Sequence, residues 1–556
     1  MSRRIKTEDS TFNSLRTPGT VYVDKTGLLA KLLSSSSGFF VNRPRKFGKT
    51  LLLSTIEAFF RGEEEIFEGL EIKKSSVTWE KYPVIKFSMN TVVSDNVDEL
   101  KGSLNCLVRG KAEEFQITLP DVNNPNVLFN ELIRKVRNSF GKKVVILIDE
   151  YDAPVLTLLN DEEGEMAKRC ESTLARFYGI IKAAANDDLL RFRYVTGITR
   201  LVKDSFGSSL NDLAAVDDQP DCPELSTLFG FTLSEIQSTF RPELRELAKK
   251  TGWSVAKVEA EMERRYNGYN WNLQGSDEAQ VFNPYAISCL FAKKAFGQYW
   301  AEVNVPRWLL AFFRRCDYVQ AAEILSGIIP TRGRPLSVSS LLESSSLELM
   351  RIAMWECGLL TAKFSGDEGQ CAFPNNEVSV AVAKAILAHM KKPETEEATS
   401  FHLSAKAMVD SLSNDDLESF LKEIEKLIRS VPSVMVGKRF DIRYQEATYH
   451  MLLFSVLYCL PISPEKVQWT TEKTVARGRI DLVVVSKKAV YIVELKCNEA
   501  PEVALRQIKE NGYAAFPELE REHADKDVYL VGVSFFFRQG APVEVKTIFE
   551  KVKSKK

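Results

Sequence analysis

The sequence predicts an α/β protein with a parallel sheet in its N-terminal part, a mainly helical middle region and a second α/β domain at its C-terminus. Three patterns support this prediction. A short apolar run at residues 38–41 leads through a loop containing Gly-Lys-Thr into a helical pattern, as a strand-loop-helix unit does. A longer apolar run at residues 144–148 ends in an acidic pair. Two apolar runs, at residues 481–486 and 489–494, are separated only by two lysines, which is typical of a β-hairpin.

The loop at residues 42–50 has the context of a phosphate-binding loop, because it follows a strand pattern and precedes a helical pattern at residues 51–60. In such loops, backbone amides at a helix N-terminus point at the anion. Gly48, Lys49 and Thr50 form the closing half of the motif, with Lys49 for the β- and γ-phosphates and Thr50 for a metal ion. The opening glycine is missing, since Arg43 occupies its position.

The run of five apolar residues that ends before Asp149 describes a buried parallel strand. The carboxyl end of such a strand delivers carboxylates to a crevice. We therefore expect Asp149 to hold the Mg²⁺ of a bound nucleotide and Glu150 to polarise the attacking water. The alternative is that these two carboxylates cap a helix that follows the strand.

A further strand pattern starts at Leu190 and ends in hydroxyl-bearing residues. Either Thr196 or Thr199 is expected to sense the γ-phosphate, with Arg200 as a local cation. Ordinary loop roles are the alternative for all three. The residues assigned to nucleotide binding are therefore Arg45, Gly48, Lys49, Thr50, Asp149, Thr196 and Arg200.

The C-terminal hairpin predicts a second site. Pairing about a turn at Lys487 and Lys488 places Asp481 directly opposite Glu494, with Cβ atoms about 5 Å apart. Lys496 shares a face with Glu494, because side chains alternate along a strand. Two carboxylates this close would repel each other, whereas a divalent cation that prefers oxygen ligands would neutralise both. This pattern is typical of a metal-dependent phosphodiesterase.

The segments around the hairpin predict the order helix, three strands, helix and final strand. The expected helices and strands beyond the hairpin are residues 440–460, 467–474, 501–516 and 527–536. The first helix carries Glu446, which we assign as a further metal ligand. Its alternative role is that of an exposed residue on the polar face of an amphipathic helix.

This C-terminal part, roughly the last 120 residues, resembles the PD-(D/E)XK nuclease superfamily. Asp481 matches the Asp of that motif, Glu494 and Lys496 match its (D/E)XK, and Gln507 with Tyr513 match residues often found on the following helix. The resemblance implies a restriction-endonuclease-like α/β domain. It also implies that the carboxylates hold Mg²⁺ and that the metal and Lys496 activate and orient a water. The alternative is that these charges are solvated strand ends.

The whole chain resembles the family of AAA-ATPase-like proteins, which often end in a PD-(D/E)XK nuclease domain. The motifs that carry this resemblance are Tyr-Val-Asp-Lys-Thr (22–26), Arg-Pro-Arg-Lys-Phe-Gly-Lys-Thr (43–50), Ile-Asp-Glu-Tyr-Asp (148–152), Val-Thr-Gly-Ile (195–198), Tyr-Asn-Gly-Tyr (266–269), Asn-Pro-Tyr (283–285) and Pro-Asn-Asn-Glu-Val (374–378). The resemblance implies an additional-strand P-loop NTPase fold of the AAA/STAND type. It also suggests kinship with signalling or mobile-element ATPases, and the family commonly has Arg-Pro-Arg where the first glycine is expected.

Length and composition agree with a large globular protein. A chain of 556 residues accommodates about three domains, for which we expect the bounds 1–235 (P-loop domain), 236–400 (helical lid with a winged-helix-like unit) and 401–556 (nuclease-like domain). The net charge of −1 provides no global attraction to nucleic acid, so binding must come from local basic surfaces.

The nine cysteines include no Cys-x-x-Cys pair, which favours a reducing compartment such as the cytoplasm, or the nucleus in a eukaryote. The N-terminus carries no long apolar run. The most apolar segment, residues 451–462, is too short for the roughly 20 residues that a membrane-spanning helix needs. We therefore expect no membrane association.

The function expected from these patterns is an ATP-binding and ATP-hydrolysing switch that is coupled to a Mg²⁺-dependent nuclease acting on DNA. The catalytic residues would be Glu150, Asp481, Glu494, Lys496 and Gln507, and the metal ligands Thr50, Asp149, Glu446, Asp481 and Glu494. One alternative is a signalling or assembly ATPase, a homo-oligomer whose nuclease-like domain recognises nucleic acid without cutting it. Another is a DNA-handling factor of a mobile element.

Overall fold

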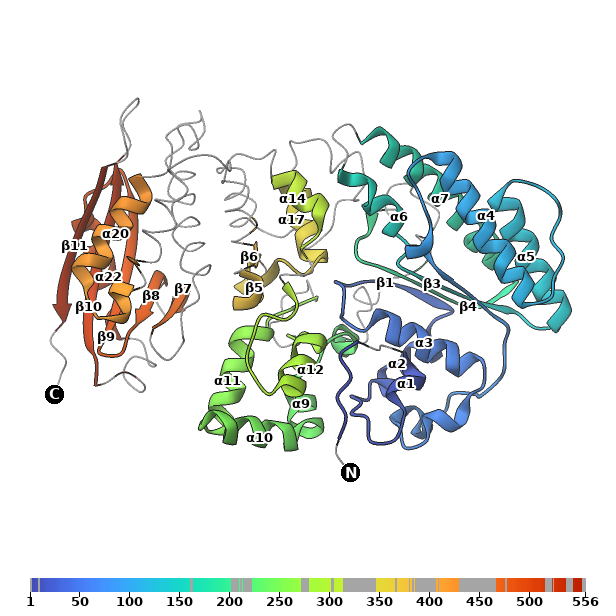
Figure 1. Ribbon diagram of the computed structural model, residues 1–556, viewed down its shortest axis with the longest axis horizontal. Coiled ribbons are helices and arrows are strands. Elements are labelled where there is room, and N and C mark those ends of the chain that lie inside the picture. Colours follow the sequence, from blue (N-terminus) through green and yellow to red (C-terminus); the bar gives the residue numbers. More distant parts are fainter. Residues whose placement is uncertain are drawn as a thin grey trace. The chain divides into compact units, whose positions relative to one another are not determined.

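The structure is a computed structural model (Figure 1). The residues that it describes are 3–8, 11–160, 164–201, 210, 213, 223–271, 280–301, 305–313, 347–365, 368–379, 381–382, 385, 407–408, 410–429, 467–475, 478–515, 523, 525–536 and 544–552. The chain forms two compact units: residues 1–311 with 327–378, and residues 312–326 with 379–556. The domain bounds expected from the sequence stay a prediction.

The first unit contains a sheet of four parallel strands in the spatial order β1-β4-β3-β2. The strands are β1 (Gly38–Asn42), β2 (Val84–Ser88), β3 (Val144–Asp149) and β4 (Leu190–Gly197). Because β4 lies between β1 and β3, the additional-strand fold is confirmed. Asn42 pairs with Gly197, and Ser88 pairs with Asp149, so the carboxyl ends of the strands lie at one edge of the sheet.

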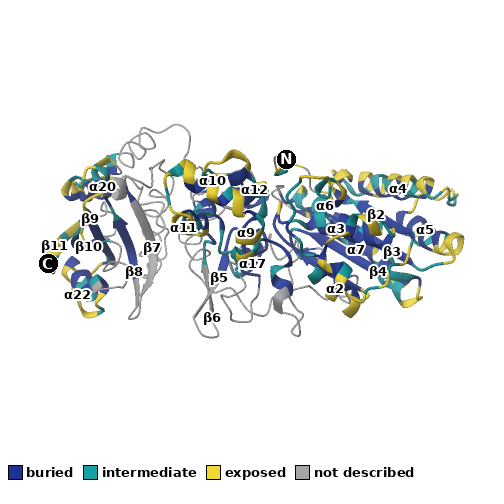
Figure 2. Cartoon of the chain, turned by 90° about the horizontal axis from the view of Figure 1, so that it is seen from below, coloured by how far each residue is buried: buried dark blue, intermediate teal, exposed yellow. Residues whose placement is uncertain are grey.

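Helices cover both faces of this sheet (Figures 1 and 2). One face packs against α1, α2 and α3, whose apolar side chains share a core with β1, β3 and β4. The other face packs against α5 and α7, as the contacts of Phe87 with Phe129 and Phe177 show, and α4 packs against these two helices. The helix bounds are α1 (Phe12–Leu15), α2 (Thr26–Ser35), α3 (Lys49–Phe60), α4 (Val97–Glu114), α5 (Pro125–Phe140) and α7 (Glu165–Asn186).

Local sequence explains where α4 begins and where α5 begins and ends. The Asn96 side chain accepts hydrogen bonds from the amides of Asp98 (3.0 Å) and Glu99 (2.9 Å) and so caps α4. Asn124 caps α5 in the same way, and Pro125 occupies the first position of that helix, where no amide donor is needed. Gly141 ends α5 in the left-handed region, with φ of 62°.

The middle part of the first unit is mainly helical, as the sequence predicts. Its elements are α9 (Leu233–Thr239), α10 (Arg241–Thr251), α11 (Val255–Tyr266), α12 (Pro284–Lys293), α14 (Arg307–Phe313), α17 (Leu347–Glu356), β5 (Thr361–Ser365) and β6 (Glu368–Ala372). Strands β5 and β6 pair antiparallel and form a hairpin. Most of residues 377–400, at the end of the middle region expected from the sequence, lie outside the described residues.

The second unit contains a mixed sheet of five strands in the order β11-β10-β9-β8-β7. Only β9 and β10 run parallel to each other. Its elements are α20 (Leu417–Arg429), β7 (Gln468–Val475), β8 (Gly478–Val485), β9 (Ala489–Cys497), α22 (Pro501–Glu510), β10 (Asp527–Phe536) and β11 (Glu544–Val552). Leu505 and Ile508 of α22 pack on one face of this sheet.

Two sequence expectations for this unit need correction. The strand at residues 527–536 is not the final one, because β11 follows and pairs antiparallel with it. Along β11 only Val545 is buried, so this edge strand lacks the apolar alternation by which strands are recognised. The helix expected at 501–516 ends at Glu510, since Gly512 takes a φ of 65° that starts a short 3-10 turn. No helix in the described part of the chain is both long and apolar enough to cross a membrane.

Candidate functional site

The loop between β1 and α3 has the backbone of a phosphate-binding loop. It begins after Asn42 at the carboxyl edge of the sheet and ends at Gly48, which directly precedes α3. Gly48 takes a φ of 91°, and no described atom lies within 4 Å of the point where a Cβ would be. The helix N-terminus therefore presents open backbone to an incoming anion.

Lys49 is buried inside this loop. Its ammonium donates hydrogen bonds to the carbonyl oxygens of Arg43 (2.7 Å) and Pro44 (2.9 Å). Burial lowers the pKa of Lys49 to about 8, although the carboxylates of Asp149 and its neighbours act in the opposite direction. The phosphates of a nucleotide would be stronger acceptors for this ammonium than the two neutral carbonyls are.

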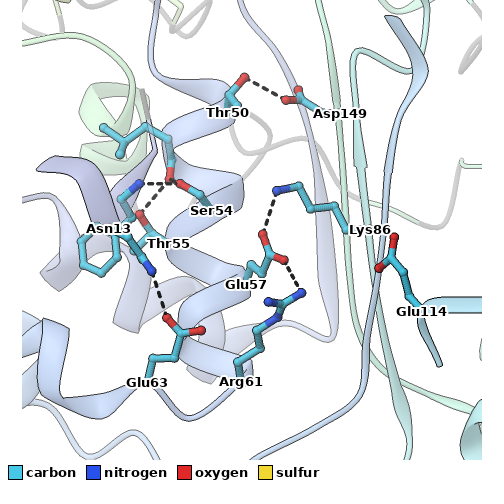
Figure 3. Close-up of polar contacts among 12 residues, drawn as sticks. Asn13, Thr50, Ser54, Thr55, Glu57, Arg61, Glu63, Lys86, Glu114 and Asp149 are labelled. Atoms are coloured by element: carbon cyan, nitrogen blue, oxygen red, sulfur yellow. Dashed lines mark hydrogen bonds and ion pairs between the residues drawn. The ribbon is translucent and has the colours of Figure 1, made fainter. Parts of the chain in front are cut away.

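Thr50 and Asp149 approach each other from different elements. The Thr50 hydroxyl at the start of α3 donates a hydrogen bond of 2.8 Å to Asp149 Oδ2 at the end of β3 (Figure 3). Both oxygens are ligands that Mg²⁺ accepts. The two groups expected to hold the metal of a bound nucleotide are therefore already adjacent, and with Lys49 and the open Gly48 backbone they fit a Mg²⁺-nucleotide.

Glu150 follows Asp149 in a left-handed conformation, with φ of 53°. Such conformations are costly for residues other than glycine and cluster at functional sites. Burial, and then the neighbouring charge of Asp149, raises the pKa of the Glu150 carboxyl. A carboxylate with a raised pKa is a better proton acceptor, which suits the role expected for Glu150.

The hydroxyl residues at the end of β4 make hydrogen bonds within the protein. The Thr196 hydroxyl is fully buried and donates to the carbonyl oxygen of Val41 at 2.9 Å. The Thr199 hydroxyl donates to Asp152 at 2.7 Å, as does the Thr199 amide. Asp152 also accepts from the amide of Ile198, so this carboxylate, which the sequence did not assign to a site, fixes the turn after β4.

Arg200 and Arg45 lie at different places around the loop. The Arg200 amide donates to Glu356 at 3.0 Å, and its guanidinium lies 3.7 Å from the same buried carboxylate and 3.4 Å from Asn42 Oδ1. Arg45 is exposed, and its carbonyl oxygen accepts a hydrogen bond from the indole of Trp300. Because Glu356 and Trp300 come from the middle region, that region contributes to the surroundings of the phosphate loop.

The C-terminal hairpin has the register that the sequence predicts. Strands β8 and β9 pair from Leu482 opposite Val493 to Val485 opposite Val490, so the next positions along the two strands are Asp481 and Glu494. Asp481 is only 8% exposed, and its Oδ2 accepts a hydrogen bond of 2.7 Å from the Leu495 amide. The carboxylate therefore lies against the backbone of the neighbouring strand.

The Glu494 carboxylate accepts hydrogen bonds from side chains of two elements, β9 and α22. Its Oε1 accepts hydrogen bonds from the Lys496 ammonium, at 3.3 Å on the same strand, and from the Gln507 amide on α22. Gly532 pairs with Glu494 from the parallel strand β10, and a Cβ there would lie 2.4 Å from the Pro501 carbonyl oxygen at the start of α22. The absence of a side chain at Gly532 thus lets α22 approach the sheet and brings Gln507 to Glu494.

The donors in this region fit a hard divalent cation. The Asp481 and Glu494 carboxylates are neighbours just beyond the last paired residues of β8 and β9. The Ser534 hydroxyl, beside Lys496 in the register, is fully buried without a hydrogen-bond partner among the described residues. Such an orphaned hydroxyl is expected where a water or ion belongs. The described residues include no group of three or more His, Cys, Asp or Glu side chains that could hold a metal ion, and Glu446 lies outside them.

Comparison with known proteins finds one family match around each of the two candidate sites. A family model described as predicted AAA-ATPase matches residues 8–207, and one described as PD-(D/E)XK nuclease superfamily matches residues 444–541. A relative from Azotobacter chroococcum mcd 1, described as "Uncharacterized protein in vnfD 5'region", is 29% identical over 528 residues and covers 92% of each chain. No solved structure matches the chain. Both domain resemblances inferred from the sequence are therefore confirmed.

Proposed function

We propose that this protein, with its AAA-ATPase-like and PD-(D/E)XK nuclease superfamily domains, is an ATP-dependent switch that cleaves DNA with the help of Mg²⁺. The observation that supports cleavage is the convergence on Glu494 of the Lys496 ammonium and the Gln507 amide, next to Asp481 across the hairpin. Two buried carboxylates beside a lysine, just beyond the last paired residues of β8 and β9, are the groups that a metal-dependent phosphodiesterase would use.

In the proposed reaction, Asp481 and Glu494 would hold the metal ion. Bound Mg²⁺ supplies an activated water and neutralises charge that grows on the scissile phosphate. Lys496 orients that water and carries positive charge close to the phosphate. The Gln507 amide donates to Glu494 Oε1 and so keeps in place the carboxylate that would hold the metal ion.

At the N-terminal site, Lys49 exchanges the carbonyl oxygens of Arg43 and Pro44 for nucleotide phosphates. Thr50 and Asp149, which are hydrogen-bonded to each other, would hold the Mg²⁺ that accompanies ATP. Glu150 accepts a proton from the water that attacks the γ-phosphate, which its raised pKa favours. This exchange of acceptors by a buried ammonium is the step through which nucleotide binding changes the loop.

The test measures ATP turnover and the cleavage of plasmid DNA with Mg²⁺ for the wild type, Lys49→Ala and Glu494→Ala. Glu494→Ala is expected to lose cleavage and to keep ATP turnover, whereas Lys49→Ala loses ATP turnover and changes the rate of cleavage. Cleavage that survives Glu494→Ala contradicts the nuclease site. Cleavage that is unchanged in Lys49→Ala, with and without ATP, contradicts the coupling.

A second candidate function is a nucleotide-dependent assembly protein whose nuclease-like domain binds DNA without cutting it. The observation that favours it is the hydrogen bond of 2.7 Å that Asp481 Oδ2 accepts from the Leu495 amide, because it gives this carboxylate a structural role that needs no metal ion. Gel filtration with and without ATP, together with a DNA-binding assay on Asp481→Ala, separates the two proposals. Nucleotide-dependent oligomers that bind DNA equally well without Asp481 favour the assembly protein.

A further inference from the structure

Arg43 stands where a phosphate-binding loop ordinarily has its first glycine. Its side chain is 1% exposed and turns back into the protein, where Nη1 donates a hydrogen bond of 2.8 Å to the Asn42 carbonyl oxygen. The guanidinium carbon lies 4.8 Å from the ring centroid of Trp271 and 5.4 Å from that of Phe229. Both distances are typical of a cation over an aromatic ring. The Cβ that the motif ordinarily excludes is thus accommodated by a dedicated aromatic pocket.

Aromatic residues between positions 269 and 300 also contact the rest of the phosphate-binding loop. The buried ring of Phe47 packs against Tyr269, Trp271 and Trp300, with centroid distances of 4.8, 5.5 and 6.0 Å. The Trp300 indole donates a hydrogen bond of 2.8 Å to the carbonyl oxygen of Arg45. Arg43, Arg45 and Phe47, at alternate positions of the loop, therefore each contact an aromatic residue that lies more than 200 positions later in the chain.

These aromatic side chains are themselves fixed. The Trp355 indole donates to the Asn270 carbonyl oxygen at 3.1 Å, and its ring contacts that of Trp271. The buried Glu377 carboxylate accepts hydrogen bonds from the successive amides of Tyr299, Trp300 and Ala301. A pocket held by such bonds presents a rigid surface to the loop.

From these contacts we infer that Arg43 is a positioning residue for nucleotide binding. Its contacts with Trp271 and Phe229 fix the conformation of the loop and so replace the conformational role of the missing glycine. The connection to the phosphate is short. The carbonyl oxygens of Arg43 and Pro44 are the acceptors that hold the Lys49 ammonium, so the anchor that fixes Arg43 also fixes the place from which Lys49 reaches a phosphate. This inference rests on the proposed binding of ATP at the loop.

The test compares Arg43→Gln with Arg191→Gln by titration with a fluorescent ATP analogue and Mg²⁺. Arg191 is the matched control, because its guanidinium also lies over two rings, those of Phe60 (5.7 Å) and Tyr82 (5.6 Å), but near the start of β4 and away from the loop. Arg43→Gln is expected to bind the analogue at least 10-fold more weakly than the wild type, and Arg191→Gln within about 2-fold of it.

Two further variants separate positioning from folding. Arg43→Lys keeps a cation over the rings and is expected to recover part of the lost affinity. Arg43→Gly restores the common motif and is nevertheless expected to bind at least 10-fold more weakly, because the loop loses its anchor. Thermal unfolding of each variant reports on folding separately, and affinity is compared per folded molecule.

The outcomes are distinct. If wild-type protein binds the analogue and Arg43→Gln or Arg43→Gly binds it as tightly, the inference is overturned while the proposed function stands. A lower unfolding temperature of Arg43→Gln with unchanged affinity also overturns it, because the arginine is then structural only. If the wild type does not bind the analogue, the proposed nucleotide site fails and this inference fails with it.

Discussion

Replacing Gly532 with alanine tests whether α22 must lie close to the sheet to complete the site around Glu494. An alanine Cβ would lie 2.4 Å from the Pro501 carbonyl oxygen and 3.2 Å from the Ala504 Cβ. Contacts below 3.0 Å do not persist, so the start of α22 and Gly532 must separate by at least about 0.6 Å. Overpacking of this kind costs about 1–3 kcal/mol, and for a domain of this size each kcal/mol lowers the unfolding temperature by about 2–4 °C.

The assay follows thermal unfolding of the second unit and Mg²⁺-dependent cleavage of plasmid DNA for the same preparations. We expect Gly532→Ala to unfold at a lower temperature and to cleave more slowly, since Gln507 moves away from Glu494 together with α22. The matched control is Gly102→Ala in α4, where an added Cβ meets no described atom within 4 Å and alanine favours the helix by about 0.5–1 kcal/mol. Unfolding and cleavage of Gly532→Ala that equal those of the wild type refute this reasoning.

Three other predictions concern the first unit. Thr50→Val removes the hydroxyl beside Asp149 and should abolish Mg²⁺-stimulated ATP turnover in a phosphate-release assay, while a variant with wild-type turnover contradicts the assigned ligand. Phe47→Ala empties a buried aromatic site and should destabilise the first unit by about 3–5 kcal/mol in urea unfolding, whereas a loss below about 1 kcal/mol counts against the packing. Burial raises the pKa of the Asp152 carboxyl, so the native state binds its proton more tightly than the unfolded chain does. The protonated carboxyl therefore contributes to stability below pH 3.8, and this contribution is lost as the pH rises through the pKa of the native state. The wild type should therefore lose unfolding temperature relative to Asp152→Asn between pH 4 and pH 7, and a constant difference over that range contradicts it.

Much of the fold could be predicted because its strands are buried on both faces or alternate regularly. The β8-β9 register follows from two apolar runs with a two-residue turn, and the structure has that register. The place of β4 between β1 and β3 followed from a family resemblance, since periodicity alone does not order parallel strands. The edge strand β11 escaped prediction because most of its side chains are exposed on both faces.

The environment of the phosphate loop could not be read from local patterns. Arg43 and Phe47 of the loop have aromatic partners that lie far along the chain. Similarly, the Trp300 indole donates a hydrogen bond to the carbonyl oxygen of Arg45, 255 positions earlier. Likewise, a strand pattern that ends in hydroxyls does not tell which hydroxyl faces a ligand. Thr196 and Thr199 both donate to protein acceptors, Val41 and Asp152, which only the packed sheet determines.

The most direct test of the central claim is a calorimetric titration of Mn²⁺ into nucleotide-free protein. The claim is that Asp481 and Glu494 jointly hold a divalent cation at the end of the β8-β9 hairpin. We expect the wild type to bind Mn²⁺ at this site, and both Asp481→Asn and Glu494→Gln to bind at least 10-fold more weakly. Wild-type affinity in both variants would contradict the account, because the two carboxylates would then not be the ligands.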